Sequence, residues 1–578
     1  MRAHALLAEV DQLVPPTPRP RLDVTVGVAA SDWTAAGLSW EWNQQRLTPT
    51  SWRQLVGAAV PDLVLVEYAD DMVPGWGPPE DGQLPEFLSW CKANAVQVVV
   101  WVTSGADDPG RAAPLVSCAD RLFVHAPGAV DTWRARFEAH PVDVLLPATQ
   151  PRVHHRGTHA DAGQSNLAAA LVLDPAGVGP KTADTLQRLV GPGLGPLSST
   201  ELDVWAIGDD PDADPIRREI PDELGTRVVG TRPYEKIAAL LPRYRVLVDT
   251  GLLDSAATWS LLDAGAAHTS VVLPGGRPAD LPPDLAACVA VADSPLTLRG
   301  EVVARIHQPE LRDRMALRLN RAVLAGHTYA HRTEQILASL GRTTPGTQRT
   351  VSAVVPTNRE GQLPTILANV ARQRHPDLEV VLVLHGLDLA QQEIRARARD
   401  LGIGHLTIVD ADKTVSLGAC MNLGIDAASG AYIAKMDDDN YYGAHYLTDL
   451  VASFDYTDAG VVGKWAHYVW LRATGAVVLR YVAAEHRYER RVQGGSMVIR
   501  GDLARALKFA DLPRGVDTDF LDRARGDGVR IYSADRFNFV SIRGTDRSAH
   551  TWQAADTTFL TASGRLAFYG DPRAHVDV

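Results

Sequence analysis

The sequence has few cysteines and lacks any long apolar run. Among its 578 residues are four cysteines, none in a Cys-x-x-Cys or Cys-x-x-His spacing. Neither a disulfide framework nor a structural zinc site is therefore indicated, and a reducing compartment fits. No apolar stretch reaches the roughly 18 residues of a membrane-spanning helix, and residues 1–21 hold no apolar segment of signal-peptide length. We expect a cytoplasmic protein, for which any contact with the inner face of the membrane would be peripheral.

Positive charge is also in short supply. The chain has 57 Lys and Arg against 69 Asp and Glu, for a net charge of −12. This balance argues against a general nucleic-acid binder. Hydrophobic residues make up 46% of the chain, which is ample for several buried cores, and the length suggests three to four domains. Polar or proline-rich linkers stand at residues 15–20, 150–164 and 341–347.

The most informative segment is residues 431–440, a short apolar strand that ends in Asp437, Asp438 and Asp439. Three neighbouring carboxylates repel one another unless a cation holds them, and Mg²⁺ and Mn²⁺ prefer such oxygen ligands. A metal bound there would attract a diphosphate. For an isolated triplet, the alternative is a solvated acidic turn.

The flanking segments favour the metal interpretation. Apolar residues at three- and four-residue intervals predict a helix over 417–428, which Gly430 ends. Two further strands are expected at 350–355 and 378–384, the first running into the turn Pro356-Thr357-Asn358-Arg359. Alternating strands and helices indicate a mostly parallel sheet, whose ligands bind at the carboxyl ends of the strands. Both the turn and the Asp triplet lie at such ends.

These motifs together resemble a family 2 glycosyltransferase of the GT-A fold, and the resemblance covers residues 348–555. It rests on the Pro-Thr-Asn-Arg turn, the Asn422-x-Gly424 helix, Asp437-x-Asp439, the acidic stretch 516–523 and the late His550. It implies a donor site for a nucleotide-diphospho-sugar, with UDP favoured by family habit. The implied donor-site residues are Pro356, Thr357, Asn358, Arg359, Asp412, Asn422, Asp437, Asp438, Gly494 and Gly495.

The resemblance also implies the chemical roles. Asp437, Asp439 and His550 would bind Mn²⁺ or Mg²⁺, and Asp517 would be the base that takes the acceptor proton, with Asp519 as the runner-up. A base without an opposing nucleophile implies single displacement and inversion. Many relatives have an acidic pair after the second strand that reads the nucleotide base. Here Leu384-His385-Gly386 stands there, so Asp410 or Asp412 is the candidate replacement, with a solvated loop as the alternative.

Several other residues have two interpretations. Gly494 and Gly495 allow backbone to approach a ligand closely, although they equally suit a bulge or turn. The aromatic residues of 465–470 fit a sugar-stacking platform, although ordinary core aromatics of a strand are favoured. His467 and His486 read more readily as structural residues than as ligands.

The front of the chain, to about residue 340, predicts folded domains of its own. Apolar strand-like runs recur at α/β spacing in two series, which two consecutive Rossmann-like units explain. The first series is 24–28, 63–66, 98–102, 122–124 and 144–146, and the second is 171–173, 204–207, 246–248 and 270–273.

This region resembles the spore-maturation branch of GT-B glycosyltransferases. The resemblance rests on the Trp101 strand followed by Asp107-Asp108-Pro109, the crossing 146–149 and the closing helix 326–332. Ser260 stands where that family has a ribose-binding Glu, which suggests a degenerate scaffold. Asp249 and Asp254 are candidates for an unusual site, with ordinary strand-end residues as the alternative.

The expected architecture is α/β, with a GT-B-like pair of Rossmann-like domains followed by a GT-A domain. We place the first unit at 1–160, the second at 161–340, a linker at 341–349 and the GT-A domain at 350–578. The expected function is metal-dependent, inverting sugar transfer to a glycan or lipid-linked glycan acceptor of a bacterial cell envelope or surface glycopolymer. The alternatives are a bifunctional transferase with both halves active and a non-catalytic nucleotide-sugar-binding scaffold.

Overall fold

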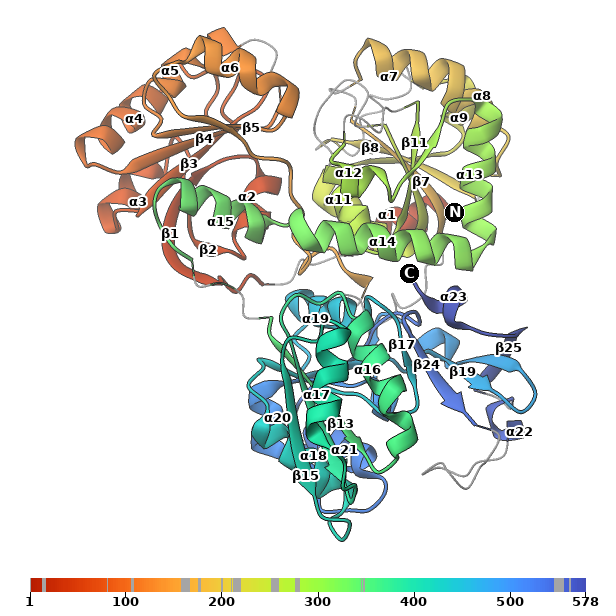
Figure 1. The fold of residues 1–578 in the computed structure, drawn as a ribbon. Coiled ribbons are helices and arrows are strands. Elements are labelled where there is room, and N and C mark those ends of the chain that lie inside the picture. The colour runs from red at the N-terminus through yellow and green to blue at the C-terminus, as the bar shows by residue number, and fades with distance from the viewer. Residues whose placement is uncertain are drawn as a thin grey trace. The chain divides into compact units, whose positions relative to one another are not determined.

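A computed structural model describes residues 2–12, 17–80, 82–104, 109–156, 167–174, 178–198, 201–208, 210, 220–250, 259–275, 281–344, 346, 349–544, 556–560 and 563–578. The chain divides at about residue 345 into two compact units, each with its own cores. Figure 1 shows the helices and strands of both units.

The first unit contains two separate six-stranded parallel sheets, which confirms the expected pair of Rossmann-like folds. The first sheet has the order β2-β1-β3-β4-β5-β6. Its strands are β1 (Leu22–Ala29), β2 (Trp42–Arg46), β3 (Leu63–Tyr68), β4 (Gln97–Val102), β5 (Arg121–Val124) and β6 (Val142–Val144). The second has the order β12-β11-β10-β7-β8-β9. Its strands are β7 (Leu167–Leu173), β8 (Leu202–Ile207), β9 (Val228–Arg232), β10 (Tyr244–Asp249), β11 (Ser270–Pro274) and β12 (Ala290–Ala292).

Each of these sheets is buried on both faces, as the run of apolar residues in β3 illustrates. Val64 and Val66 belong to one hydrophobic core, and Leu63 and Leu65 belong to the core on the opposite face. This alternation follows from the two-residue period of a strand, and burial of both faces is typical of parallel sheets. The helices of the first half are α2 (Asp32–Leu38), α3 (Trp52–Ala58), α4 (Leu84–Ala93), α5 (Ala113–Val116) and α6 (Val130–Arg136). Those of the second half are α7 (Pro180–Thr185), α8 (Gly191–Leu194), α9 (Asp222–Gly225), α10 (Tyr234–Leu240), α11 (Trp259–Ala266), α12 (Pro283–Ala286), α13 (Pro295–His307) and α14 (Pro309–Gly326).

The two halves of the first unit exchange helices. The first helix, α1 (Arg2–Gln12), places Leu6 and Val10 in a core of the second sheet. In return, α15 (Tyr329–Ser339) places Tyr329, Ile336 and Leu337 in a core of the first sheet. A sequence boundary at residue 160 is therefore crossed in both directions, because each half completes its core with a helix from the other.

The second unit is built on an eight-stranded mixed sheet of order β15-β14-β13-β16-β22-β18-β23-β21. Its strands are β13 (Val351–Thr357), β14 (Leu378–His385), β15 (Leu406–Ala411), β16 (Tyr432–Lys435), β18 (Val461–Gly463), β21 (Arg487–Tyr488), β22 (Val498–Arg500) and β23 (Ile531–Ser533). A five-stranded sheet accompanies it, in the order β17-β24-β19-β20-β25. Those strands are β17 (Tyr441–Tyr442), β19 (His467–Leu471), β20 (Ala476–Arg480), β24 (Phe539–Arg543) and β25 (Gly564–Tyr569).

Helices pack on this mixed sheet through residues that the apolar spacing identifies. The helix α18 (Leu417–Ala427) buries Met421 and Ile425 against Val354 and Val383 of the sheet. Ser416 caps its N-terminus by accepting a hydrogen bond from the backbone N–H of Ala419. The other helices are α16 (Leu363–Arg372), α17 (Gln391–Asp400), α19 (Tyr446–Tyr456), α20 (Gly501–Leu507), α21 (Val516–Gly526), α22 (Asp556–Phe559) and α23 (Arg573–Val576).

Candidate active site

The turn after β13 and the acidic triplet after β16 lie side by side, because the two strands pair in parallel with Val354 opposite Lys435. The guanidinium of Arg359 donates from Nε to Asp438 Oδ2 at 3.1 Å and also forms an ion pair with Oδ1 of that residue. It also contacts Asp439 Oδ2 at 3.0 Å. Part of the repulsion within the triplet is therefore neutralised by a cation of the protein itself.

Asp438 faces inward and positions this turn. Its side chain is 8% exposed, and its Oδ2 also accepts the Thr357 hydroxyl at 2.6 Å. Burial by itself would lower the pKa of Arg359, but its hydrogen bonds and charge interactions with Asp438 and Asp439 outweigh that and raise it. Arg359 therefore stays charged, and Asp438 serves as its anchor.

Lys435, the last residue of β16, joins two carboxylates that are far apart in the sequence. Its Nζ lies 2.5 Å from Asp437 Oδ1 and 3.4 Å from Asp517 Oδ1, and its side chain is 3% exposed. Burial would lower the pKa of Lys435, but the two carboxylates raise it instead. Burial raises the pKa of Asp437, Lys435 lowers it, and the charge of Asp517 raises it again, so the net direction is upward.

The glycine pair packs against the carboxylates of Asp437 and Asp517, in the turn Gly494–Ser496. A Cβ on Gly494 would stand 2.9 Å from Asp517 Cβ and closer still to its Oδ2, and a Cβ on Gly495 would stand 2.9 Å from Asp437 Cγ. The turn is held by Tyr442, whose hydroxyl donates to the Gly495 carbonyl at 2.7 Å and accepts the Asp437 N–H at 2.7 Å. Glycine is therefore required here because the two carboxylates touch the backbone.

The two acidic residues of the first turn of α21 point to different partners. Asp517 faces Lys435 and Gly494, whereas Asp519 Oδ2 accepts the Arg523 Nε at 2.8 Å. Arg523 also donates to the carbonyls of Leu507 and Lys508. Of the two, Asp517 is the one that stands beside Asp437.

The other expected donor-site residues lie apart from this cluster of contacts. Asn422 exchanges two hydrogen bonds of 2.8 Å with the backbone of Phe509, Asp412 accepts the Thr414 N–H at 2.8 Å, and Asn358 is exposed. The Thr414 hydroxyl and N–H lower the pKa of Asp412. Asp410 accepts Gln391 Nε2 at 2.8 Å. His550 lies outside the described residues.

The suitability of the site for a divalent metal depends on the carboxylates at its surface. Within the described part of the chain, no group of three or more His, Cys, Asp or Glu side chains is arranged to hold a metal. Mg²⁺, however, usually takes only one or two carboxylates, together with water and substrate phosphates. Asp437 and Asp439, 32% and 21% exposed, supply two such carboxylates, so the donor chemistry fits a metal shared with a diphosphate.

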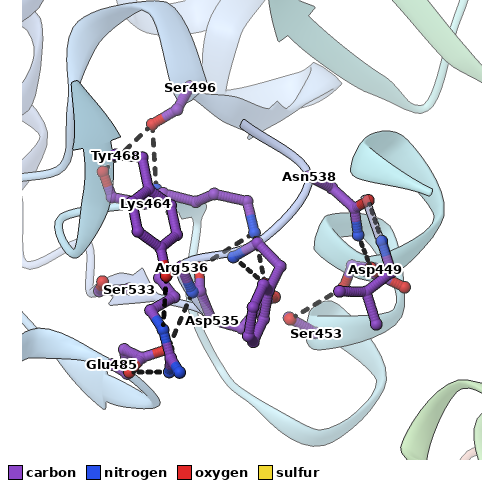
Figure 2. A network of polar contacts seen from close by, with 12 residues as sticks. Asp449, Ser453, Lys464, Tyr468, Glu485, Ser496, Ser533, Asp535, Arg536 and Asn538 are labelled. Carbon is purple, nitrogen blue, oxygen red and sulfur yellow. Dashed lines mark hydrogen bonds and ion pairs between the residues drawn. The ribbon is translucent and has the colours of Figure 1, made fainter. Parts of the chain in front are cut away.

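The structure adds basic residues that the sequence argument missed. Lys435 is one, and its signal is a lysine inside an otherwise apolar strand. Lys464 is another: its buried Nζ donates at 3.0 Å to both the carbonyl and Oδ1 of Asp535, as Figure 2 shows. The same view shows Ser496 Oγ accepting the Lys464 N–H at 3.0 Å, which ties this network to the glycine turn.

In the first unit, the most buried acidic contact lies between the two halves. Asp263 of α11 accepts the Thr149 hydroxyl at 2.5 Å and the Tyr234 hydroxyl at 3.0 Å, and its side chain is fully buried. Burial raises the pKa of Asp263 to about 7. Ser260 lies on the same helix and Asp249 ends β10, whereas Asp107, Asp108 and Asp254 lie outside the described residues.

No helix within the described ranges is both long and apolar enough to cross a membrane.

One protein-family model matches the part of the chain that contains this site. Residues 352–512 match the model of the family described as Glycosyl transferase family 2. No curated protein matches the sequence.

Several solved structures are similar to part of the chain. One is S. aureus TarS 1–349 in complex with UDP-GlcNAc, at 18% identity and a TM-score of 0.29, over 34% of this chain and 59% of that one. The mannosyltransferase PcManGT from Pyrobaculum calidifontis, in complex with GDP-Man and Mn²⁺, has 19% identity and a TM-score of 0.29, over 35% and 59%. GalNAc-T7 with UDP, GalNAc and Mn²⁺ has 12% identity and a TM-score of 0.28, over 35% and 45%.

The chain spans about three fifths of the length of the first two of these structures. Because the TM-scores are low, these likenesses support no conclusion about the whole chain. The family match stands independently of them, and it covers the turn after β13, the acidic triplet, Lys435 and the glycine pair. Residues 352–512 therefore form a family 2 glycosyl transferase domain within the second unit.

Proposed function

We propose that the second unit transfers a sugar from a nucleotide-diphospho-sugar to an acceptor hydroxyl with inversion at the anomeric carbon, and that Asp517 is the base. The observation that carries this proposal is the meeting of Asp437 and Asp517 at the ammonium of Lys435. A carboxylate held beside the acidic triplet is within reach of both a bound donor and an incoming hydroxyl.

The donor would lie along the carboxyl ends of β13 and β16. The charged side chain of Arg359 faces this edge of the sheet, and the backbone of the glycine pair allows a ligand to approach closely. The residues proposed to contact the donor are Pro356, Thr357, Asn358, Arg359, Asp412, Asn422, Asp437, Asp438, Gly494 and Gly495.

Asp437 and Asp439 would hold Mn²⁺ or Mg²⁺ together with the donor diphosphate, with His550 as a further candidate ligand. When bound, the metal would neutralise the charge that develops on the leaving diphosphate. This chain's own contribution to the same task is Arg359, which pairs with Asp439 at 3.0 Å.

The proton of the acceptor hydroxyl would pass to Asp517 as the acceptor oxygen bonds to the anomeric carbon. The bond from that carbon to the diphosphate breaks in the same step, and the nucleoside diphosphate departs. Lys435 would hold Asp517 in position for this step, since its Nζ lies 3.4 Å from Asp517 Oδ1. Asp519 is the second candidate for the base.

The acceptor is proposed to be a glycan or lipid-linked glycan of the cell envelope or of a surface glycopolymer, modified at the inner face of the membrane. For the first unit, we propose a GT-B-like arrangement of its two sheets that acts as a scaffold. The exchange of α1 and α15 between the two halves supports one continuous structural body.

Calorimetric titration of UDP, GDP, TDP and CMP, with and without Mn²⁺, tests the donor site on the full chain and on Asp439→Ala. Asp222→Ala, an exposed substitution in the first unit, serves as the matched control. We expect one nucleotide to bind only with metal, and Asp439→Ala to abolish that binding. Nucleotide binding that persists in Asp439→Ala would show that the donor site lies elsewhere in the chain. Absence of binding for all four nucleotides would support a scaffold.

A further inference from the structure

A cavity of about 570 Å³ opens in the second unit, and none of the catalytic carboxylates lines it. Its wall combines an aromatic pair, two arginines, a carboxylate and a hydroxyl. These residues are Trp465, Tyr481, Arg487, Glu489, Ser563 and Arg565. A concave site with aromatic walls and a few polar groups is the usual form of a small-molecule site.

The two aromatic rings of the cavity wall are stacked on each other. Trp465 and Tyr481 stack with ring centroids 4.1 Å apart and planes 9° from parallel. The Arg480 guanidinium lies 4.6 Å from the Tyr481 ring centroid. Flat aromatic surface of this kind suits the C–H face of a sugar ring, which packs through dispersion contacts while its hydroxyls remain free for hydrogen bonding.

The backbone of Tyr481, which carries one of the two stacked rings, is strained. Its φ is 49° and its ψ is 47°, in the left-handed region that a bulky residue rarely adopts. Two hydrogen bonds of 2.8 Å hold it there, from Tyr481 N–H to the Ser563 carbonyl and from Ala484 N–H to the Tyr481 carbonyl. Strain that the surrounding structure maintains is a feature of ligand sites.

The cavity carries an excess of positive charge in a chain whose net charge is −12. Arg487 pairs with Glu489 at 3.0 Å and is thereby neutralised. Arg565 is exposed, and no described residue forms a hydrogen bond or an ion pair with its side chain. One guanidinium is therefore free to bind an anionic group on a ligand.

One loop ties this cavity to the proposed base. The Lys464 carbonyl, next to Trp465, accepts the Gln493 N–H at 3.0 Å, and Ser496 Oγ accepts the Lys464 N–H (Figure 2). Gln493 is followed by Gly494, whose Cα faces the Asp517 carboxylate. The Oε1 of Gln493 is buried and has no hydrogen-bond partner among the described residues. A ligand in the cavity would therefore lie next to the loop that borders Asp517.

We infer that this cavity is an acceptor subsite for a sugar unit that bears a carboxylate or phosphate group. The ring stacks on the aromatic pair and the anionic group pairs with Arg565. The assignment of this cavity to the acceptor rests on the proposed function, because the cavity adjoins the reacting groups only if Asp517 is the base.

Glucose, glucuronate and glucose 6-phosphate test this inference, because they differ only at carbon 6, which is a hydroxymethyl group, a carboxylate or a phosphorylated hydroxymethyl group. Their binding to the full chain is measured by saturation-transfer NMR. We expect both anionic sugars to bind at least about threefold more tightly than glucose, as one exposed ion pair would produce. Arg565→Gln should remove that preference, whereas Arg399→Gln, an exposed arginine of α17, should leave it unchanged.

Tyr481→Asn removes the ring and retains a residue that tolerates left-handed backbone. We expect it to weaken all three sugars and to leave nucleotide binding by calorimetry unchanged. The subsite is overturned if the three sugars bind equally, or if neither Tyr481→Asn nor Arg565→Gln alters their binding. The anionic sugars could bind as expected while none of the four nucleotides binds. That result would contradict the proposed function and would still support a sugar site in this cavity. A stronger signal for one anion identifies which group the acceptor carries.

Discussion

Lys435 Nζ lies 3.4 Å from Asp517 Oδ1, so a buried ammonium at the end of β16 faces a carboxylate in the first turn of α21. The same ammonium lies 2.5 Å from Asp437 Oδ1. One cation thus links the acidic triplet to the proposed base.

Lys435→Met should leave two neighbouring carboxylates without their shared cation. We expect a loss of stability at the lower end of about 3–5 kcal/mol, because the cation is buried but both carboxylates are partly exposed. The turnover rate should also fall, since Asp437 and Asp517 lose the cation that holds them side by side. Urea unfolding and the rate of donor turnover measure the two effects.

Lys508→Met is the matched control, because Lys508 forms a more exposed pair with Asp426. It should cost about 0–1 kcal/mol and leave the turnover rate unchanged. Equal effects of the two substitutions would contradict a special role for Lys435.

Asp517→Asn and Asp519→Asn distinguish the two candidates for the base. We expect Asp517→Asn to lower kcat by about 10²–10⁴-fold, the usual contribution of a general base. Asp519 forms a part-exposed pair with Arg523 one helical turn away. Its replacement should cost about 0.3–0.5 kcal/mol of stability and little activity. Steady-state rates and urea unfolding of both variants provide the comparison, and the reverse order of rates would identify Asp519 as the base.

Gly494→Ala should displace the Asp517 carboxylate, because the new Cβ would overlap its Oδ2. A displacement on the order of 1 Å can lower the rate about 10²-fold, so we expect a loss of that size in kcat. Gly526→Ala on α21 is the control, since a Cβ there meets nothing within 4 Å. A Gly494→Ala enzyme with the kcat of the wild type would show that the turn does not hold Asp517.

Asp263→Asn should change the pH dependence of stability in the first unit. Burial raises the pKa of Asp263 to about 7, whereas an Asp in an unfolded chain ionises near pH 4. The folded state therefore retains the proton over this range, and the stabilisation is full below about pH 4 and is lost as the pH rises through about 7. Asn has no such transition, so the stability of the wild type relative to Asp263→Asn should fall between pH 5 and pH 8, by about 2–3 kcal/mol.

Chemical unfolding at the two pH values measures this difference, and the exposed Asp222→Asn is the comparison. A difference between wild type and Asp263→Asn that does not change with pH would contradict the raised pKa of Asp263.

Much of the fold follows from local patterns in the sequence. The apolar runs at 63–66, 98–102 and 246–248 all lie in strands, because parallel strands buried on both faces carry near-continuous apolar residues. The short strands β2, β9 and β12 were missed, since β2 is polar and the other two are brief and partly buried. The exchange of α1 and α15 was also missed, because amphipathic spacing does not say which sheet a helix covers.

The sequence by itself determined that polar residues follow β13 and β16 and that a glycine pair and a second acidic motif come later in the chain. Only the tertiary structure decided that Lys435 joins Asp437 to Asp517 and that Asn422 binds the Phe509 backbone. The physical reason is range: local spacing governs which strand or helix forms, whereas side chains distant in sequence meet only where strand pairing and helix packing bring them together.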